Sequence, residues 1–373
     1  MIDMQEVTYF ERERYWTIGS CGATLLTHKY SRTDIKIGGF LMSNKQVGVG
    51  VVGVGFVGGQ AHAPAFRNIA RSKLVGLSAR TERRVKPLAE RYGVKYFLDH
   101  MELIRNPEVD AIVVATPTPL HYEVVKAAID KGRHVMCEMP LIATVKETED
   151  LGRLAEKAGV LLMPVLNFRF TPNYVKAKEL LGKGTIGDPV AVCFREFIPA
   201  NDQSAQWPAG SWAWDKSESG GYPDFTLSVW SIDLLRWLFE AEYAEVEWKT
   251  NYIPLEQFGG TLGYSTMGLI KMTNGVVGSL YYSSMASTTA GTSRLEVVGK
   301  NTFALQADWN NSLTLIGEEP ARQEWKFREE GTKVWGHYQI DEHFIKCVLG
   351  EQKPQITVKD AMKAQEIAAK MVR

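Results

Sequence analysis

The segment that most constrains the fold is an apolar run that ends in closely spaced glycines. Residues 47–54 have the continuous apolar character of a strand that is buried on both faces of a parallel sheet. Gly53, Gly55 and Gly58 follow in a G-x-G-x-x-G spacing, and a helix pattern extends over residues 61–70. The first glycine permits a tight turn, the second lets the backbone approach a pyrophosphate, and the third lets the helix pack on the strand. The pattern predicts a dinucleotide-binding unit, with a glycine-rich turn that holds no ligand as the alternative.

The second predicted strand, over residues 73–79, indicates which nicotinamide cofactor to expect. A protein that binds NAD places Asp or Glu at the end of this strand, where it binds the ribose 2′-hydroxyl. This chain has Ala79 there, followed by Arg80 and Thr81. The missing carboxylate removes repulsion against a 2′-phosphate, and arginine can bind that group through charge-assisted hydrogen bonds. We therefore expect NADP rather than NAD, although Arg83 and Arg84 fit a solvated helix start equally well.

Strands and helices continue to alternate along the chain. Residues 109–115 and 134–138 are further buried-strand patterns, and a helix is expected from about His121. Another helix is expected after Thr144, because Glu147 three residues later completes a capping box. This alternation predicts an α/β Rossmann domain with a doubly wound parallel sheet.

Composition excludes several classes of protein. The 373 residues carry 43 Lys and Arg against 43 Asp and Glu, and 45% are hydrophobic, which excludes a disordered chain. Without a basic field we expect no nucleic-acid partner, and without an apolar stretch of about 18 residues we expect no membrane span. A small-molecule substrate is the remaining expected partner.

The positions of the cysteines and tryptophans in the sequence give further indications. Cys21, Cys137, Cys193 and Cys347 are widely spaced, so we expect no metal site and no disulfide scaffold, and a cytoplasmic location fits best. Nine of the ten tryptophans lie between residues 207 and 335. They indicate either an aromatic pocket or oligomer face in a second domain, or ordinary aromatic packing there.

The chain divides into four expected parts. Residues 1–41 show no persistent hydrophobic period and precede a plausible start at Met42. We expect them to be an upstream translation or a loose extension outside the native fold. Residues 42–166 are the expected NADP-binding Rossmann domain, and 167–350 an α+β domain for substrate and oligomerisation. Residues 351–373 are expected to form a C-terminal helix that packs back toward the Rossmann domain.

Several segments together resemble the glucose-fructose oxidoreductase, inositol dehydrogenase and rhizopine-catabolism (Gfo/Idh/MocA) family. They are VGVGFVGGQAH, ATPTPLHYEVVKAAIDKGRHV, CEMPL, NFRF with KELLGKGTIGDPV, and SWAWDKSESGGY. The resemblance implies a second domain of α+β type with a large, mostly antiparallel sheet, an active site between the domains, and a homodimer or homotetramer formed through that sheet. It also implies oxidation or reduction of a hydroxyl/carbonyl pair on a sugar or cyclitol with NAD(P).

The resemblance also implies positions for the cofactor. The pyrophosphate would be lined by Gly53, Gly55, Phe56, Val57 and Gly58. Thr116, Pro117 and His121 would lie beside the cofactor, and Glu138, followed by Met139, would lie near the nicotinamide ribose. A histidine at a helix start also fits a purely structural role.

The family's catalytic positions are altered in this chain. Its Glu-Lys-Pro signature is Glu138-Met139-Pro140 here, and Thr226 and Trp230 stand where its later signature has Asp and His. Oxidation of an alcohol by hydride transfer needs a base for the hydroxyl proton, and neither methionine nor tryptophan can exchange one. These substitutions predict an atypical acid/base.

Residues near the altered positions are candidates for the site. The candidate acids or bases are Tyr222, Asp224 and Asp233, and the candidate substrate contacts are Arg169, Trp214 and Trp230. Each has a structural alternative: a packing aromatic, a helix N-cap ahead of residues 225–238, a hydrogen-bonded helix residue, or part of an aromatic core.

Three functions remain open at this stage. The leading hypothesis is an NADP-dependent oxidoreductase with an atypical acid/base that acts on a sugar-like or other small carbonyl or alcohol. The second is a non-catalytic NADP-binding sensor or partner protein. The third is an enzyme that uses a tightly held cofactor for a non-redox elimination or epimerisation.

Overall fold

The computed structural model describes residues 35–37, 40–42, 45–258, 260–286, 292–308, 312–319, 321–328 and 335–372. The chain separates into two units, residues 1–44 and residues 45–373. In the first unit, β1 (Ile35–Ile37) and β2 (Phe40–Met42) pair in antiparallel fashion. The rest of the expected extension, with Trp16 and Cys21, lies outside the described residues, so its relation to the native fold stays a prediction.

The second unit begins with a six-stranded sheet in which every strand pair is parallel. Its order is β5-β4-β3-β6-β7-β8. The strands are β3 (Val47–Val52), β4 (Ser72–Ser78), β5 (Lys95–Phe97), β6 (Ala111–Val114), β7 (His134–Cys137) and β8 (Leu162–Pro164). All six residues of β3 are buried, as the unbroken apolar run predicted. The doubly wound parallel sheet expected from the sequence is confirmed.

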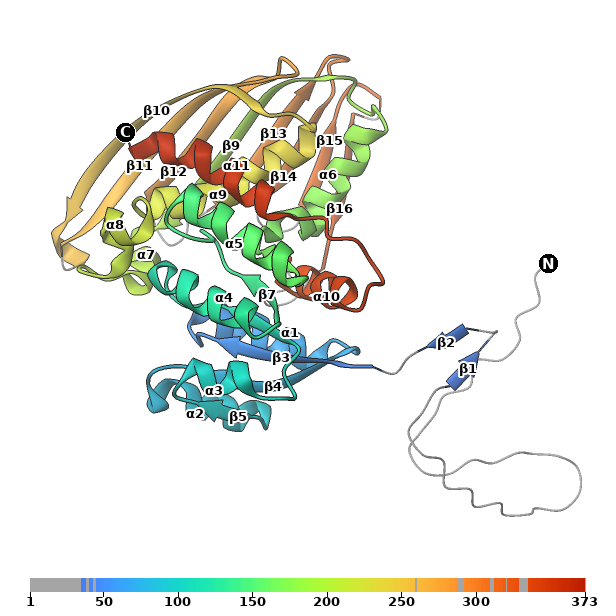
Figure 1. Ribbon diagram of the computed structural model, residues 1–373. Helices are drawn as coiled ribbons and strands as arrows, with labels where there is room; N and C mark the ends of the chain where they lie inside the picture. Colours follow the sequence, from blue (N-terminus) through green and yellow to red (C-terminus); the bar gives the residue numbers. More distant parts are fainter. Residues whose placement is uncertain are drawn as a thin grey trace, which may run out of the picture. The chain divides into compact units, whose positions relative to one another are not determined.

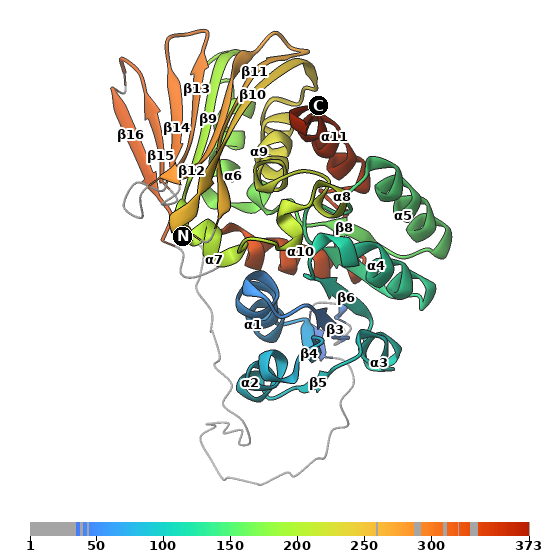
Figure 2. The ribbon, with the colours of Figure 1, turned by 90° about the vertical axis from the view of Figure 1, so that its left-hand side faces the viewer.

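Helices cover both faces of this sheet. They are α1 (Ala63–Asn68), α2 (Glu82–Tyr92), α3 (His100–Arg105), α4 (His121–Asp130) and α5 (Val145–Ala158). Figure 2 shows α1 and α2 on one side of the sheet and α3 and α4 on the other. Thr144 is the N-cap of α5, as predicted, and the Glu147 backbone N–H donates to Thr144 Oγ1 over 3.2 Å. The Glu147 carboxylate accepts from the Thr144 hydroxyl over 2.6 Å and not from the Thr144 backbone N–H, so the predicted capping box is only half formed.

The remainder of the second unit is built on an eight-stranded sheet of order β10-β11-β12-β9-β13-β14-β15-β16. Only β12 and β9 pair in parallel, so the expected mostly antiparallel sheet is confirmed. The strands are β9 (Pro189–Pro199), β10 (Tyr243–Leu255), β11 (Thr261–Met272), β12 (Val277–Ala286), β13 (Thr292–Gly299), β14 (Ala304–Asp308), β15 (Ser312–Ile316) and β16 (Arg322–Lys326).

One face of this large sheet is covered by helices. The helices of this part of the chain are α6 (Pro172–Gly182), α7 (Ala200–Gln206), α8 (Lys216–Ser219), α9 (Pro223–Phe239), α10 (His337–Val348) and α11 (Val358–Ala368). Figures 1 and 2 show α6, α9 and α11 on the same side of the sheet. Along β11, Thr266, Gly268 and Ile270 are buried, whereas Met267 and Leu269 between them are exposed. The opposite face therefore presents apolar side chains to its surroundings.

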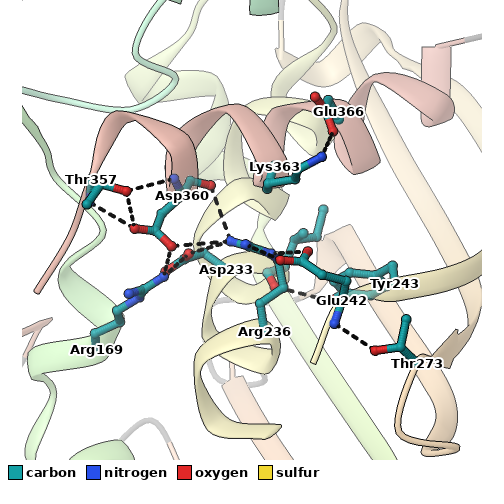
Figure 3. A network of polar contacts seen from close by, with 11 residues as sticks. Arg169, Asp233, Arg236, Glu242, Tyr243, Thr273, Thr357, Asp360, Lys363 and Glu366 are labelled. Atoms are coloured by element: carbon teal, nitrogen blue, oxygen red, sulfur yellow. Dashed lines mark hydrogen bonds and ion pairs between the residues drawn. The ribbon is translucent and has the colours of Figure 1, made fainter. Parts of the chain in front are cut away.

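Helix α11 packs against both α9 and α5, so it joins the two sheet layers. The Gln365 side chain donates to the Ile142 carbonyl, and Thr148 Oγ1 donates to Gln365 Oε1 over 3.1 Å. A buried ion network lies beside this contact (Figure 3). Arg169 donates twice to Asp233, over 2.7 and 2.5 Å, and also reaches Asp360 of α11 over 2.9 Å.

Replacing Asp233 by Asn tests how much this network contributes to the stability of the fold. The change removes a charge that is 1% exposed and leaves the Arg169 guanidinium without its bidentate partner. Breaking a buried pair in this way costs about 3–5 kcal/mol, so we expect that loss in the free energy of unfolding measured by chemical denaturation.

The matched control is Asp130→Asn, because Asp130 pairs with Lys126 on an exposed face of α4. An exposed pair contributes at most about 1 kcal/mol. Equal losses of unfolding free energy in the two variants would contradict the stabilising role assigned to Asp233.

Candidate active site

One cavity of about 790 Å³ opens between the two sheet layers of the second unit. On the side of the parallel sheet it is lined by the glycine turn and by residues that follow strands β4, β6 and β7. On the other side it is lined by residues of β9 and α9, and by several tryptophans. The lining includes Gly53, Gly55, Phe56, Val57, Ala79, Arg80, Thr81, Thr116, Pro117, His121, Glu138, Met139, Glu196, Trp207, Trp212, Thr226, Trp230, Trp335 and His337.

The glycine turn has the geometry that a pyrophosphate requires. Gly53 has a φ of +95°, and a Cβ there would lie 2.4 Å from the Ala115 carbonyl oxygen. A Cβ at Gly58 would lie 2.0 Å from the Gly53 carbonyl oxygen, whereas a Cβ at Gly55 would meet no atom within 4 Å. The first and third glycines are thus needed for internal packing, and the second leaves the backbone open toward the cavity. These residues fit a dinucleotide.

The end of the cavity beside β4 is basic. Arg80, Thr81 and Arg84 line it, whereas Arg83 does not. Glu82 follows Thr81 in the sequence but is not among the lining residues, and its Oε1 accepts from Tyr96 Oη over 2.8 Å and from Lys86 Nζ over 3.2 Å.

A buried charge cluster lies below the glycine turn. His62 is fully buried, with Nδ1 2.9 Å from Asp341 and Nε2 3.0 Å from Glu138. Burial disfavours the charged ring, but the two carboxylates outweigh it and raise the pKa of His62 to about 10. Burial likewise favours the neutral acid at Glu138, but His337 and His62 lower the pKa of Glu138 to about 2. His337 Nε2 lies 3.4 Å from Glu138.

Among the described residues, His62, Glu138 and His337 form the group best spaced to hold a metal ion, since their ligand atoms lie within 4.8 Å of one another. Both nitrogens of His62 already contact carboxylates. The expectation of no metal rested on cysteine spacing and stays a prediction. Cys137, Cys193 and Cys347 are free thiols, and Cys21 lies outside the described residues.

His121 supports the loop that carries Met139. Its Nε2 lies 2.7 Å from the Thr116 carbonyl oxygen, and its Nδ1 lies 3.0 Å from that of Leu141. Burial lowers the pKa of His121. Both ring nitrogens lie within hydrogen-bond distance of backbone carbonyl oxygens, so the side chain positions the segment from Met139 to Leu141.

Unpartnered buried polar atoms concentrate on this cavity. The side-chain atoms that are buried and have no hydrogen-bond partner within the described part of the chain include His100 Nε2, Thr116 Oγ1, Asn167 Oδ1, Glu196 Oε2, Thr226 Oγ1 and His337 Nδ1, all from residues that line it. An unsatisfied buried polar atom costs about 1–3 kcal/mol. Such atoms on one cavity indicate a place where a polar ligand completes the hydrogen bonds.

Glu196 is the least expected of these residues. It lies on β9 on the same face as the buried Val192 and Phe194, and it is 9% exposed. Burial raises the pKa of Glu196 to about 7. A carboxyl with such a pKa can exchange a proton at neutral pH.

The three candidate acids or bases from the sequence do not line the cavity. Tyr222 packs edge-on against Tyr252 with ring centroids 4.9 Å apart. Asp224 is buried and accepts from Thr266 Oγ1 over 2.7 Å, so it does not cap α9, whose N-cap position is held by Tyr222. Asp233 is held by Arg169 in the network of Figure 3.

The candidate substrate contacts divide between the cavity and other places. Trp230 lines the cavity, and its Nε1–H donates to the Val165 carbonyl over 2.9 Å, which fixes the ring as part of the wall. Trp214 lies behind that wall and donates to the Trp207 carbonyl, while Trp207 itself lines the cavity. The guanidinium of Arg169 is engaged by Asp233 and Asp360.

With this geometry established, comparison with known proteins identifies the family. Residues 47–165 match the Gfo/Idh/MocA oxidoreductase family with its NAD-binding Rossmann fold, and residues 174–303 match a C-terminal domain of the same family. The chain belongs to the Gfo/Idh/MocA family. The resemblance inferred from the sequence motifs is thereby confirmed.

Curated relatives match part of their length. An uncharacterized oxidoreductase of Synechocystis is 34% identical over 51% of this chain and 51% of its own. Myo-inositol 2-dehydrogenase of Thermotoga maritima is 37% identical over 38% of this chain and 42% of its own. The matched region thus spans about half the length of each of these relatives.

Solved structures share the fold over most of the chain. A probable dehydrogenase of Thermotoga maritima has a TM-score of 0.70 at 25% identity, over 86% of this chain and 94% of its own. Levoglucosan dehydrogenase in complex with NADH and levoglucosan has a TM-score of 0.74 at 20% identity, over 87% and 95%. Biliverdin reductase of Synechocystis with biliverdin and NADP+ has 0.72 at 21%, over 87% and 98%. At these identities the last two show the fold alone.

The sequence analysis missed three groups of this site: His62 with Asp341, His337, and Glu196. Asp341 follows His62 by 279 residues, so no local spacing links them. Glu196 had a usable signal, because a charged residue follows Val192 and Phe194 on the buried face of an alternating strand.

Replacing His62 by Ala tests the buried cluster. The change leaves Glu138 and Asp341 buried without their shared cation, so we expect a loss of about 3–5 kcal/mol in the free energy of unfolding at pH 6. The folded ring keeps its proton up to about pH 10, whereas the unfolded ring loses it near 6.5. The contribution is therefore complete below pH 6.5 and declines as the pH rises toward 10.

The measurement is denaturant unfolding of both proteins across this pH range, with Lys73→Ala as control, because Lys73 forms an exposed pair with Glu108. A difference between wild type and His62→Ala that does not shrink with rising pH would count against a charged His62.

Proposed function

We propose that this chain is a nicotinamide-dependent oxidoreductase that interconverts a hydroxyl and a carbonyl group on a sugar-like small molecule. The observation that carries the proposal is the single cavity shared by the open glycine turn and by the wall of Glu196, Thr226 and Trp230. A bound nicotinamide cofactor accepts or supplies the hydride. The glycine turn holds the pyrophosphate, and the tryptophan-rich wall limits the access of water to the reacting centre.

The charges around the cavity favour an uncharged substrate. Among the described residues that line it, the arginines are Arg80 and Arg84, at the end beside β4, and none is a lysine. Arg169, once a candidate for binding an anionic substrate, is engaged by two carboxylates. Trp207, Trp212 and Trp230 offer aromatic faces on which the apolar face of a sugar ring can stack. A neutral cyclic polyol or sugar fits these properties better than a phosphorylated or carboxylated one.

The name of a related protein points to the same chemical class. Myo-inositol 2-dehydrogenase is a relative by sequence. We therefore propose a cyclic polyol as substrate class.

The test is a turnover assay with purified protein, NADP+ or NAD+, and a panel of myo-inositol, levoglucosan, D-glucose and glucose 6-phosphate, followed by the absorbance of the reduced nicotinamide. We expect turnover with at least one neutral compound and none with the phosphorylated sugar. Binding of cofactor without any turnover would instead favour the non-catalytic sensor.

We further propose that NADP is the preferred cofactor, because Ala79, Arg80, Thr81 and Arg84 leave no carboxylate beside the expected 2′-phosphate. The variant Arg80→Ala should weaken NADPH binding about tenfold or more, since a charge-assisted hydrogen bond contributes about 1.5–3 kcal/mol. NADH binding should change little.

The control is Arg83→Ala, which removes a neighbouring arginine that does not line the cavity. Fluorescence titration with each reduced cofactor measures both variants. A preference of the wild type for NADH, or equal effects of the two substitutions, would overturn the proposed specificity.

We also propose that the bare face of the large sheet joins two copies of the chain. Met267 and Leu269 of β11, Val277 of β12 and Val298 of β13 are apolar and 44–59% exposed there. Apolar side chains at such density are typical of subunit interfaces. Sedimentation of the full chain should give a dimer or tetramer, and Leu269→Lys should shift it toward monomer.

Among the described residues, no helix has both the length and the apolar character needed to cross a bilayer.

A further inference from the structure

We propose that Glu196 is the acid/base that exchanges the substrate's hydroxyl proton, in place of the lysine and histidine that stand as Met139 and Trp230 in this chain. The inference rests on the proposed function. It assigns the proton-transfer step to a strand of the large sheet instead of to the two segments that carry it in the family's signatures.

The position of Glu196 supports this assignment. Its side chain lines the same cavity as Met139, Thr226 and Trp230, and its Oε2 is buried with no hydrogen-bond partner among the residues that the structure describes. A carboxyl oxygen that is kept from water and left unbonded can accept a hydrogen bond from a hydroxyl group that enters the cavity.

Within the part of the chain that the structure describes, no fixed cation lies against Glu196. In the sheet it lies opposite Tyr282 of β12 and Ser293 of β13, both buried. Arg195 is next in sequence, but adjacent residues of a strand point to opposite faces, so its guanidinium lies on the other side of the sheet and stacks over Phe197.

The ionisable groups that its charge affects are Tyr174 of α6, Tyr264 of β11 and Tyr282 of β12, whose pKa values it helps to raise. These phenols are neutral near pH 7. Desolvation alone acts on the carboxyl and raises the pKa of Glu196 to about 7.

Such a carboxyl suits proton transfer in both directions. When an alcohol is oxidised, the carboxylate of Glu196 would take the hydroxyl proton as the carbinol C–H bond breaks and C=O forms, with the hydride going to an oxidised nicotinamide bound in the cavity. In the reverse direction the protonated carboxyl would return the proton to the developing alkoxide, with the hydride supplied by a bound reduced nicotinamide. A pKa near the working pH keeps both forms populated.

The remaining ionisable groups near this part of the cavity have other contacts. Glu138 is paired with His62 and His337, and His121 faces carbonyl oxygens of the backbone. His337 is the exception. Its Nε2 lies 3.4 Å from Glu138, but its Nδ1 has no partner in the described part of the chain, so His337 is the competing candidate.

The first experiment needs neither substrate nor cofactor. Wild type, Glu196→Gln and the control Glu296→Gln are labelled with ¹³C at the glutamate carboxyl carbon and titrated by NMR. Glu296 is a half-exposed carboxylate on the neighbouring strand β13. We expect one carboxyl that titrates near pH 7, present in wild type and in Glu296→Gln and absent in Glu196→Gln. If no glutamate carboxyl titrates above about pH 6, the proposal is overturned.

The second experiment measures kcat and KM across pH with the compound of the panel that wild type turns over. For Glu196→Gln we expect kcat in the oxidation direction to fall about 10²–10⁴-fold. The rise of the rate through pH 7 should disappear, while the KM for NADP+ stays within threefold.

Three outcomes would count against Glu196. Retention of at least a third of the wild-type kcat in Glu196→Gln would overturn its role and leave the proposed function intact. Loss of the pH-dependent limb in His337→Asn, with the limb kept in Glu196→Gln, would transfer the role to His337. Absence of turnover in wild type with every compound would remove the proposed function, and the role of Glu196 with it.

Discussion

The arrangement of the two sheet layers depends on one buried electrostatic contact, in which the imidazolium of His62 lies between Glu138 and Asp341. The three side chains come from the segment after the glycine turn, from the end of β7 and from α10. A buried charge without partners would cost several kcal/mol, so each of these segments is fixed by the other two. Because Trp335 and His337 stand at the start of α10, the contact also sets the position of the wall that closes the cavity over Phe56.

A second buried network, around Arg169, also joins segments that are far apart in the sequence. It connects the turn after β8 with α9 and α11, and it engages an arginine and an aspartate that sequence motifs alone would assign to chemistry (Figure 3). Among the buried side-chain atoms without a partner in the described part of the chain, Glu196 Oε2 is the one that belongs to a carboxyl group.

The sequence permitted a reliable prediction of the parts whose signal is local. The buried run before Gly53, the glycine spacing and the N-cap at Thr144 each act within a few residues, and the corresponding elements are where they were expected. Asp224 and Asp233 could not be judged in the same way, because their roles depend on partners from β11 and from the loop after β8. The contact between His62 and Asp341 joins residues 279 positions apart, and its existence follows from the tertiary packing of α10. Glu196 lay between these cases, since its placement on a buried strand face was visible in the alternation of β9.

The long separation between His62 and Asp341 has a consequence for how the protein is made. On the ribosome, the parallel sheet is synthesised first, and its strands can pair while the rest of the chain is still absent. At that stage Glu138 can already meet His62, but Asp341 and His337 have not been translated. The charge cluster beside the glycine turn of a nascent chain therefore lacks two of its members until α10 emerges. Its completion depends on the synthesis of α10 and not on the folding of the sheet that carries the glycine turn.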